Sequence, residues 1–202
     1  MPDTTCHMSI SLDGFVAGPD QSRENPLGKR GREVHSWHLG DERANDADAT
    51  AEGWLMRPRG AYVMGRNMFG PIRGEWDEDW DGWWGSEPPY HAPVFVLTHH
   101  PRPTLEMEGG TTFHFIDASP AEALTAAKEA AGGLDVRIGG GPATVRQFLA
   151  ADLIDHMHIA LVPILLGRGE SLWDGLEGLQ ERFAIESVSS PSGATHVTFT
   201  RR

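Results

Sequence analysis

The stretch from Leu134 to Gly169 constrains the fold of this chain more than any other part of it. A short apolar strand, Leu134 to Ile138, runs directly into three consecutive glycines at 139–141. Pro142 stands where a helix would begin, and proline at that position removes no backbone donor that the helix needs. The stretch therefore predicts a strand that turns tightly into a helix.

The residues that follow complete a strand–helix–strand unit. Helical spacing gives one apolar face to the predicted helix, and strict alternation then predicts a strand that ends at Pro163. The residues of these two patterns are Val145, Phe148 and Leu149, then Met157, Ile159 and Leu161. A glycine turn at a helix start exposes backbone N–H groups at the positive end of the helix and lets a pyrophosphate approach closely.

The glycine spacing leaves two interpretations open. It is not G-x-G-x-x-G, so the usual dinucleotide fingerprint is absent. Glycines at this place serve equally as a plain tight turn and as a phosphate cradle.

Composition limits the class of protein. With 202 residues, the chain is expected to form one domain, residues 1–202. The 29 acidic and 17 basic residues give a formal charge of −12, which disfavours nucleic acid and anionic membranes as partners. The single cysteine, Cys6, excludes an internal disulfide and favours a reducing compartment. No signal-peptide layout and no membrane-spanning apolar run occur, so we expect a cytoplasmic protein.

Strands alternate with helices along the chain, which predicts an α/β layer fold with a mixed sheet. The first strand, Cys6 to Leu12, alternates and should bury one face, and residues 19–36 are expected to form a long loop. A capping box at Ser119 starts one helix. The other predicted elements are strands at 15–17, 61–64, 94–97 and 112–116, a helix at about Asp41 to Met56, and a hairpin of Phe183–Val188 with His196–Thr200.

Residues 74–90 contain four of the seven tryptophans among acids, glycines and prolines. Such a segment cannot be regular structure for long. It is either a loop packed on the body of the protein or a lid over a substrate or subunit, and the sequence leaves both possibilities open.

Four segments together resemble the dihydrofolate-reductase-like superfamily, above all the reductase domain of the bifunctional riboflavin-biosynthesis deaminase-reductase and its stand-alone relatives. They are SISLDGFVAG from Ser9, YVMGRNMF from Tyr62, PVFVLT from Pro93, and Val136 to Gly169 with its IGGG. The resemblance implies a three-layer fold, in which helices flank a mixed, mainly parallel central sheet that closes on a C-terminal β-hairpin.

The resemblance also implies NADPH as the cofactor. Gly65 and Arg66 would form a second strand-to-helix turn on the adenosine side, with Thr98 near the adenosine phosphate. A guanidinium beside a helix start suits a phosphate dianion, although an ordinary surface arginine remains the alternative for Arg66. The glycines that would face the cofactor phosphates are Gly139, Gly140 and Gly141.

Two further polar features have competing interpretations. By resemblance, the turn at Asp13 borders the nicotinamide and substrate, which makes Asp13 the candidate catalytic residue, but Asp-Gly is also a common turn former. His156 and His158 point to one strand face, yet no third ligand stands at motif spacing, so we predict no metal site.

The leading hypothesis is therefore an NADPH-dependent oxidoreductase that passes a hydride to a small, polar, heterocyclic molecule. The nearest named activity is 5-amino-6-(5-phosphoribosylamino)uracil reductase of riboflavin biosynthesis, and a homodimer is expected by resemblance. Dihydrofolate itself is not the expected substrate, since nothing selects a pterin-holding carboxylate among Asp46, Asp48 and Glu52. The alternative is a non-catalytic nucleotide-binding protein that keeps the dinucleotide site without hydride chemistry.

Overall fold

The computed structural model describes residues 2–39, 45–71, 73–76 and 80–202. The chain forms two compact units, the first from Met1–Thr5 and Pro58–Ile154, the second from Cys6–Arg57 and Asp155–Arg202. The predicted fold class is confirmed, because the chain has a mixed, mainly parallel sheet with flanking helices and a C-terminal hairpin. A single domain over the whole length stays a prediction.

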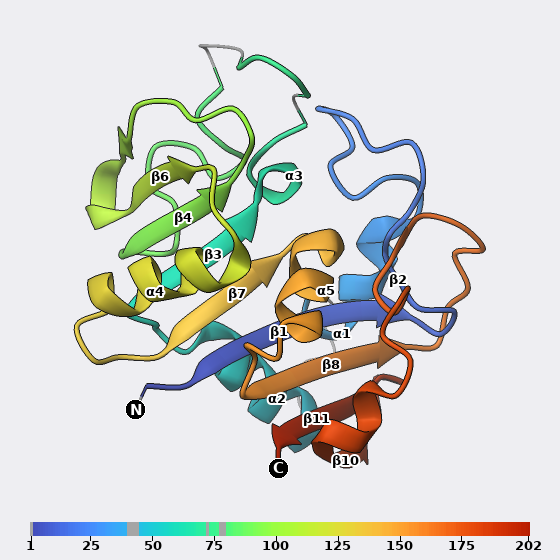
Figure 1. Ribbon diagram of the computed structural model, residues 1–202. Coiled ribbons are helices and arrows are strands. Elements are labelled where there is room, and N and C mark those ends of the chain that lie inside the picture. Colours follow the sequence, from blue (N-terminus) through green and yellow to red (C-terminus); the bar gives the residue numbers. More distant parts are fainter. Residues whose placement is uncertain (1, 40–44, 72, 77–79) are drawn as a thin grey trace. The chain divides into compact units, whose positions relative to one another are not determined.

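Four parallel strands form the sheet of the first unit, in the order β7, β3, β4, β6, and β5 lies antiparallel against β6 (Figure 1). Every residue of β3 is buried, as expected for a parallel strand covered on both faces. The bounds are β3 Ala61–Gly65, β4 Pro93–Leu97, β5 Leu105–Glu106, β6 Thr112–Ile116 and β7 Val136–Gly140. A 3₁₀ turn, η2 (Glu108–Gly110), precedes β6.

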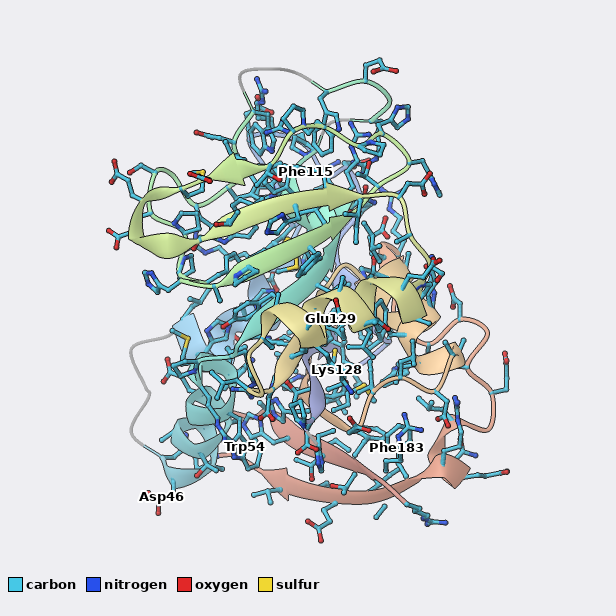
Figure 2. All side chains as sticks on the ribbon, turned by 60° about the vertical axis from the view of Figure 1, so that its left-hand side comes forward. Asp46, Trp54, Phe115, Lys128, Glu129 and Phe183 are labelled. Carbon is cyan, nitrogen blue, oxygen red and sulfur yellow. The ribbon has the colours of Figure 1, made fainter. Side chains whose placement is uncertain are left out.

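Helices α3 (Arg66–Phe69), α4 (Pro120–Ala130) and α5 (Pro142–Ala150) pack on these strands. The predicted capping box is confirmed, since Ser119 Oγ accepts from Glu122 N and the Glu122 carboxylate accepts from Ser119 N at 2.9 Å. Helix α4 buries Ala123, Leu124 and Ala127, whereas Lys128 is half-buried and Glu129 is exposed; Figure 2 labels the last two on the helix. The local sequence signals therefore place both long helices of this unit correctly.

The tryptophan-rich segment packs on the sheet of the first unit. A buried apolar cluster is formed by alternate residues of β3, β4 and β6, among them Tyr62, Val94 and Phe115. The described residues Trp76, Trp80, Trp84 and Tyr90 lie against this cluster. Of the two interpretations, the described part of the segment supports the packed loop.

The second unit has the strand order β10, β11, β8, β1. Strands β10 and β11 form the predicted C-terminal hairpin, and β11 pairs antiparallel with β8. The bounds are β1 Thr4–Ser11, β8 His156–Val162, β10 Phe183–Ser189 and β11 Thr195–Arg201, with η3 (Leu179–Arg182) before β10. A separate two-stranded sheet pairs β2 (Phe15–Ala17) with β9 (Glu170–Ser171).

Helix α2 (Asp46–Met56) begins later than the predicted Asp41, and residues 41–44 of that prediction lie outside the described residues. Asn45 caps it by accepting from Asp48 N at 2.9 Å. None of the helices in the described ranges is both long and apolar enough to cross a membrane.

The predicted loop at 19–36 is wrong at its C-terminal end. A 3₁₀ turn, η1 (Gly31–His35), and a short helix, α1 (Ser36–Leu39), occupy that part of the chain. Elements this short have no periodicity to read and are stable only through packing. Here the packing comes from Val34 and Trp37, which are both buried.

The prediction that β1 buries only one face is also wrong. Ser9 and Ser11 alternate with the apolar residues of the strand and are nonetheless buried. Trp37 Nε1 donates to Ser9 Oγ at 2.9 Å, and Ser11 Oγ donates to the Asp13 carboxylate at 2.6 Å. Because buried hydroxyls find partners on neighbouring elements, a polar strand face can be covered without leaving hydrogen bonds unmade.

A network of histidines lies in this part of the second unit. His158 Nε2 and His196 Nδ1 are 3.0 Å apart, and His196 Nε2 lies 2.7 Å from Asp48 Oδ1. A second pair, His35 and His38, shares a 3.2 Å contact between ring nitrogens. Trp37 contacts both His38 and His196 edgewise or tilted.

From the pair of His35 and His38 we predict that the stability of the protein depends on pH. Burial and, to a smaller extent, the nearby His38 together lower the pKa of His35 to about 4. The folded state then binds fewer protons than the unfolded state between the ordinary pKa of 6.5 and about 4, so stability should be full above 6.5 and fall as pH falls through this window. The free energy of unfolding, measured with urea, should fall by on the order of 1–2 kcal/mol between about pH 7 and about pH 5 because of this half-buried group.

The variant His35→Gln should flatten that pH slope, and His99→Gln, whose side chain is 93% exposed, should leave it unchanged. Equal slopes in the wild type and His35→Gln would contradict the assignment.

Candidate functional site

The predicted cofactor residues of the first unit gather at one edge of its sheet. Gly65 ends β3, Thr98 directly follows β4, and the three glycines span the end of β7 and the start of α5. The strands are parallel, with Gly65 opposite Leu97; between β3 and β7 the register shifts after Val63, which places Met64 opposite Gly140. The carboxyl edge of a parallel sheet is where ligands of α/β proteins bind.

The glycine turn between β7 and α5 leaves open space at one position. A β-carbon at Gly139 would press on Met68 Sδ at 3.3 Å, whereas a β-carbon at Gly141 would meet nothing within 4 Å. Gly140 has a φ of +131°, a conformation that side-chain-bearing residues rarely adopt, and the Gly140–Gly141 peptide bond is cis. Gly141 is the N-cap of α5 and no side chain caps that end.

Gly65 brings the two strand-to-helix turns together. A β-carbon at Gly65 would overlap Thr144 Oγ1 on α5 and approach Gly140 O at 3.7 Å. Glycine is therefore required here by close packing of one turn against the other. This role differs from the predicted contact with the adenosine side of a cofactor, which stays a prediction.

Arg66 begins α3, as the predicted second strand-to-helix turn requires. Its guanidinium carbon lies 3.9 Å from the centre of the Trp76 ring, and its Nη2 donates to Glu75 O across a long 3.4 Å contact. Its Nε is buried and has no hydrogen-bond partner among the described residues. Burial lowers the pKa of Arg66. The charges of Arg73 and Arg102 lower this pKa further, whereas Glu75 raises it.

Thr98, His100 and Arg102 complete the group of residues around Arg66 and Trp76, which we call the cationic corner. Thr98 N donates to Ile116 O, and Thr98 Oγ1 accepts from His100 N at 3.0 Å. Trp76 Nε1 donates to His100 O. Arg102 lies 4.8 Å from the centre of the Trp76 ring, and burial lowers its pKa.

Two of these residues were not predicted as site residues from the sequence. Trp76 lies in a segment without a motif, and Arg102 could be taken for part of a solvated loop end. The available signal was the concentration of arginines near tryptophans in a chain of strongly negative net charge.

Asp13 lies in the second unit, and its carboxylate is fully engaged. It accepts from Ser11 Oγ at 2.6 Å, Leu166 N at 3.1 Å and Gly167 N at 2.6 Å. Burial raises the pKa of Asp13, but these hydrogen bonds outweigh it and hold the pKa below its usual value. An ionised carboxylate cannot donate a proton, so the geometry suits a residue that positions the 166–167 loop.

His156 and His158 lie in different environments. His158 is buried and bound to His196, while His156 is exposed. Within the described ranges, no three side chains of His, Cys, Asp or Glu are placed to hold a metal ion. Cys6, the single cysteine of the sequence, is buried.

Comparison with known proteins assigns the fold. The model of the RibD C-terminal domain matches residues 2–197. No curated protein matches the sequence. A putative riboflavin biosynthesis protein from Shewanella sp. PV-4 is similar in structure, with 26% identity, a TM-score of 0.61 and 99% of each chain covered.

Two more distant structures share the fold alone. A pyrimidine reductase-like protein from Corynebacterium diphtheriae is 16% identical, with a TM-score of 0.56 over 100% of this chain and 92% of the other. A diaminohydroxyphosphoribosylaminopyrimidine deaminase/5-amino-6-(5-phosphoribosylamino)uracil reductase from Thermotoga maritima is 13% identical, with a TM-score of 0.57. This chain is covered fully in that match but spans only 57% of the Thermotoga protein. The chain belongs to the family of RibD C-terminal domains.

Proposed function

We propose that this protein is an NADPH-dependent reductase that acts on a small, polar, heterocyclic molecule of the aminopyrimidine class. The observation that carries the proposal is the meeting of two glycine strand-to-helix turns beside Arg66, whose buried Nε has no partner among the described residues. The family supports a reductase, and structures with the same fold are described as pyrimidine and uracil reductases.

The residues present fit a dinucleotide phosphate. The position beyond Gly141 is open, and the start of α5 there carries no side-chain cap, so backbone N–H groups can face a pyrophosphate. Arg66 keeps unused donors for the adenosine phosphate, and the end of β4 at Thr98 lies beside the same corner. In this proposal, Gly139–Gly141 hold the pyrophosphate and Arg66 holds the additional phosphate of NADPH.

When bound, reduced nicotinamide supplies a hydride. The chain itself is proposed to bind, orient and shield the reactants from water, which is the usual contribution of protein in cofactor chemistry. In this proposal, Asp13 fixes the loop at Leu166 and Gly167 by accepting hydrogen bonds from their amides, and a catalytic role for it stays a prediction.

The alternative is a protein that binds the nucleotide without hydride chemistry. It is favoured by the hydrogen bonds that the carboxylate of Asp13, the candidate catalytic residue, already accepts within the protein. The two possibilities are separated by an assay that follows the consumption of NADPH by its absorbance, with a panel of aminopyrimidines, pterins and quinones. Turnover of an aminopyrimidine supports the reductase, and tight NADPH binding without consumption by any compound supports the alternative. A small-molecule substrate, a homodimer and a cytoplasmic location remain part of the proposal.

The cofactor assignment predicts that Arg66→Ala weakens NADPH much more than NADH. Loss of a charge-assisted phosphate contact should cost about 1.5–3 kcal/mol, or roughly tenfold to a hundredfold in affinity, because only NADPH carries that phosphate. Calorimetric titration with both nucleotides measures this. Arg57→Ala, which removes an exposed arginine at the C-terminal end of α2, is the control and should leave both affinities unchanged; equal weakening of both nucleotides by Arg66→Ala would remove the assignment.

A further inference from the structure

Arg66 is held by an aromatic ring instead of a carboxylate. Its guanidinium lies 3.9 Å from the centre of the Trp76 ring, and its one hydrogen bond with the described residues is the 3.4 Å contact with Glu75 O. The Glu75 side chain is 94% exposed and approaches His100, at 3.5 Å. A stacked guanidinium keeps its in-plane donors, whereas an ion pair would use them.

Trp76 is itself fixed in place. Its Nε1 donates to His100 O, and its ring packs edgewise on Phe69 and Phe115 at 5.8 and 5.1 Å; Phe115 is labelled in Figure 2. Because the ring is anchored on the sheet and at the end of β4, its face is a fixed surface for the guanidinium of Arg66.

The cluster also has an excess of positive charge. The charges of Arg73 and Arg102 both lower the pKa of Arg66, and they are opposed by Glu75 at Arg66 and by Asp81 at Arg102. Arg102 contacts the Trp76 ring too and donates to Trp80 O at 3.0 Å. The chain as a whole has a net charge of −12, so a cluster of three arginines is a local exception. Such a cluster suits an anion that carries two negative charges.

We propose that Trp76 is a specificity-determining residue, which positions the Arg66 guanidinium by stacking and thereby sets the preference for NADPH over NADH. This rests on the proposed function, because the anion that Arg66 meets is the additional phosphate of NADPH. Trp76 touches the arginine and acts through it, so it is a positioning residue.

The test is the ratio of NADPH to NADH affinity, measured by calorimetric titration. Trp76→Leu should lower NADPH affinity on the order of tenfold and change NADH affinity less than about twofold, since stacking on a cation is the interaction lost. Trp84→Leu is the matched control: Trp84 packs on the same aromatic cluster through Phe113 and Tyr90, and its loss should leave the ratio unchanged.

Two further variants keep the test decisive. Arg66→Lys retains the charge but not the planar stack, so its NADPH affinity should fall although the aromatic cluster is intact; wild-type affinity in this variant would overturn the proposal. In the Arg66→Ala background, Trp76→Leu should have no additional effect on the ratio. An additional loss there, or equal losses for both nucleotides in Trp76→Leu alone, would show a merely structural Trp76 and overturn the proposal.

The failure of the proposed function gives a different result. If Arg66→Ala leaves the ratio unchanged, or the wild type binds neither nucleotide, the cofactor assignment itself is wrong and the role of Trp76 falls with it. If Arg66→Ala lowers the ratio and Trp76→Leu does not, only the inference about Trp76 is wrong.

Discussion

Gly141→Val is expected to reduce NADPH affinity by at least about a hundredfold while the protein stays folded. Gly141 has a φ of −67°, which valine adopts without strain, and a β-carbon there meets nothing within 4 Å. The free protein can therefore accommodate the valine side chain. When NADPH binds, the same side chain would occupy the space that we propose for the pyrophosphate. Calorimetric titration measures the affinity, and a thermal melt with far-ultraviolet circular dichroism reports the fold.

Gly140 is a poorer position for this experiment. With a φ of +131°, any side chain there strains the turn, so lost binding could follow from a reshaped backbone. Gly53 is the matched control for Gly141, because a β-carbon on that residue of α2 also meets nothing within 4 Å. Unchanged NADPH binding in a folded Gly141→Val protein would leave the glycines as no more than a tight turn.

Asp48→Ala is expected to lower the free energy of unfolding by about 2–3 kcal/mol, because it removes one partner from a buried hydrogen bond and leaves the other without one. The Asp48 and His196 side chains are each 4% exposed and 2.7 Å apart. Asp48 also accepts from Asn45 Nδ2 at 2.6 Å, and His196 contacts His158 at 3.0 Å, so the loss leaves several buried polar groups without partners. Urea unfolding monitored by tryptophan fluorescence measures the effect.

Asp46→Ala is the matched control, since it removes an exposed carboxylate from the first turn of the same helix and should cost less than about 1 kcal/mol. Asp48→Asn should be milder than Asp48→Ala because an amide oxygen can still accept a hydrogen bond. Similar stability of Asp48→Ala and Asp46→Ala would contradict a stabilising network at this position.

Elements with a strong local signal were predictable from the sequence. The capping box at Ser119 and the proline at 142 start α4 and α5 as predicted, and the alternating tail forms the predicted hairpin. The parallel strands follow from short apolar runs bounded by turn residues. The arrangement of Gly65, Thr98 and Gly139–Gly141 at one edge then follows, because parallel strands bring their carboxyl ends together.

Features that depend on tertiary contacts were not predictable. The short elements η1 and α1 exist because Val34 and Trp37 find buried places, and no periodicity announces them. The polar face of β1 is covered because a tryptophan N–H meets Ser9, a pairing between residues 28 positions apart. Local patterns report periodicity and turns, and they carry no information on such partners.

The candidate site was predictable in its glycines and Arg66 but not in its electrostatics. Asp13 was singled out by resemblance, yet its environment depends on the amides of Leu166 and Gly167, which are distant in the sequence. Trp76 was not singled out among the tryptophans of its segment, because local patterns do not show which arginine lies on which ring.

Transfer of deuterium from reduced, nicotinamide-deuterated NADPH to 5-amino-6-(5-phosphoribosylamino)uracil tests the central claim most directly. Mass spectrometry of the product reports whether a hydride moved from cofactor to substrate. We predict a reduced product that carries one deuterium, formed by the wild type and not by a folded Gly141→Val variant. Tight NADPH binding with no deuterated product from this compound or any other in the panel would contradict the reductase and leave a nucleotide-binding protein.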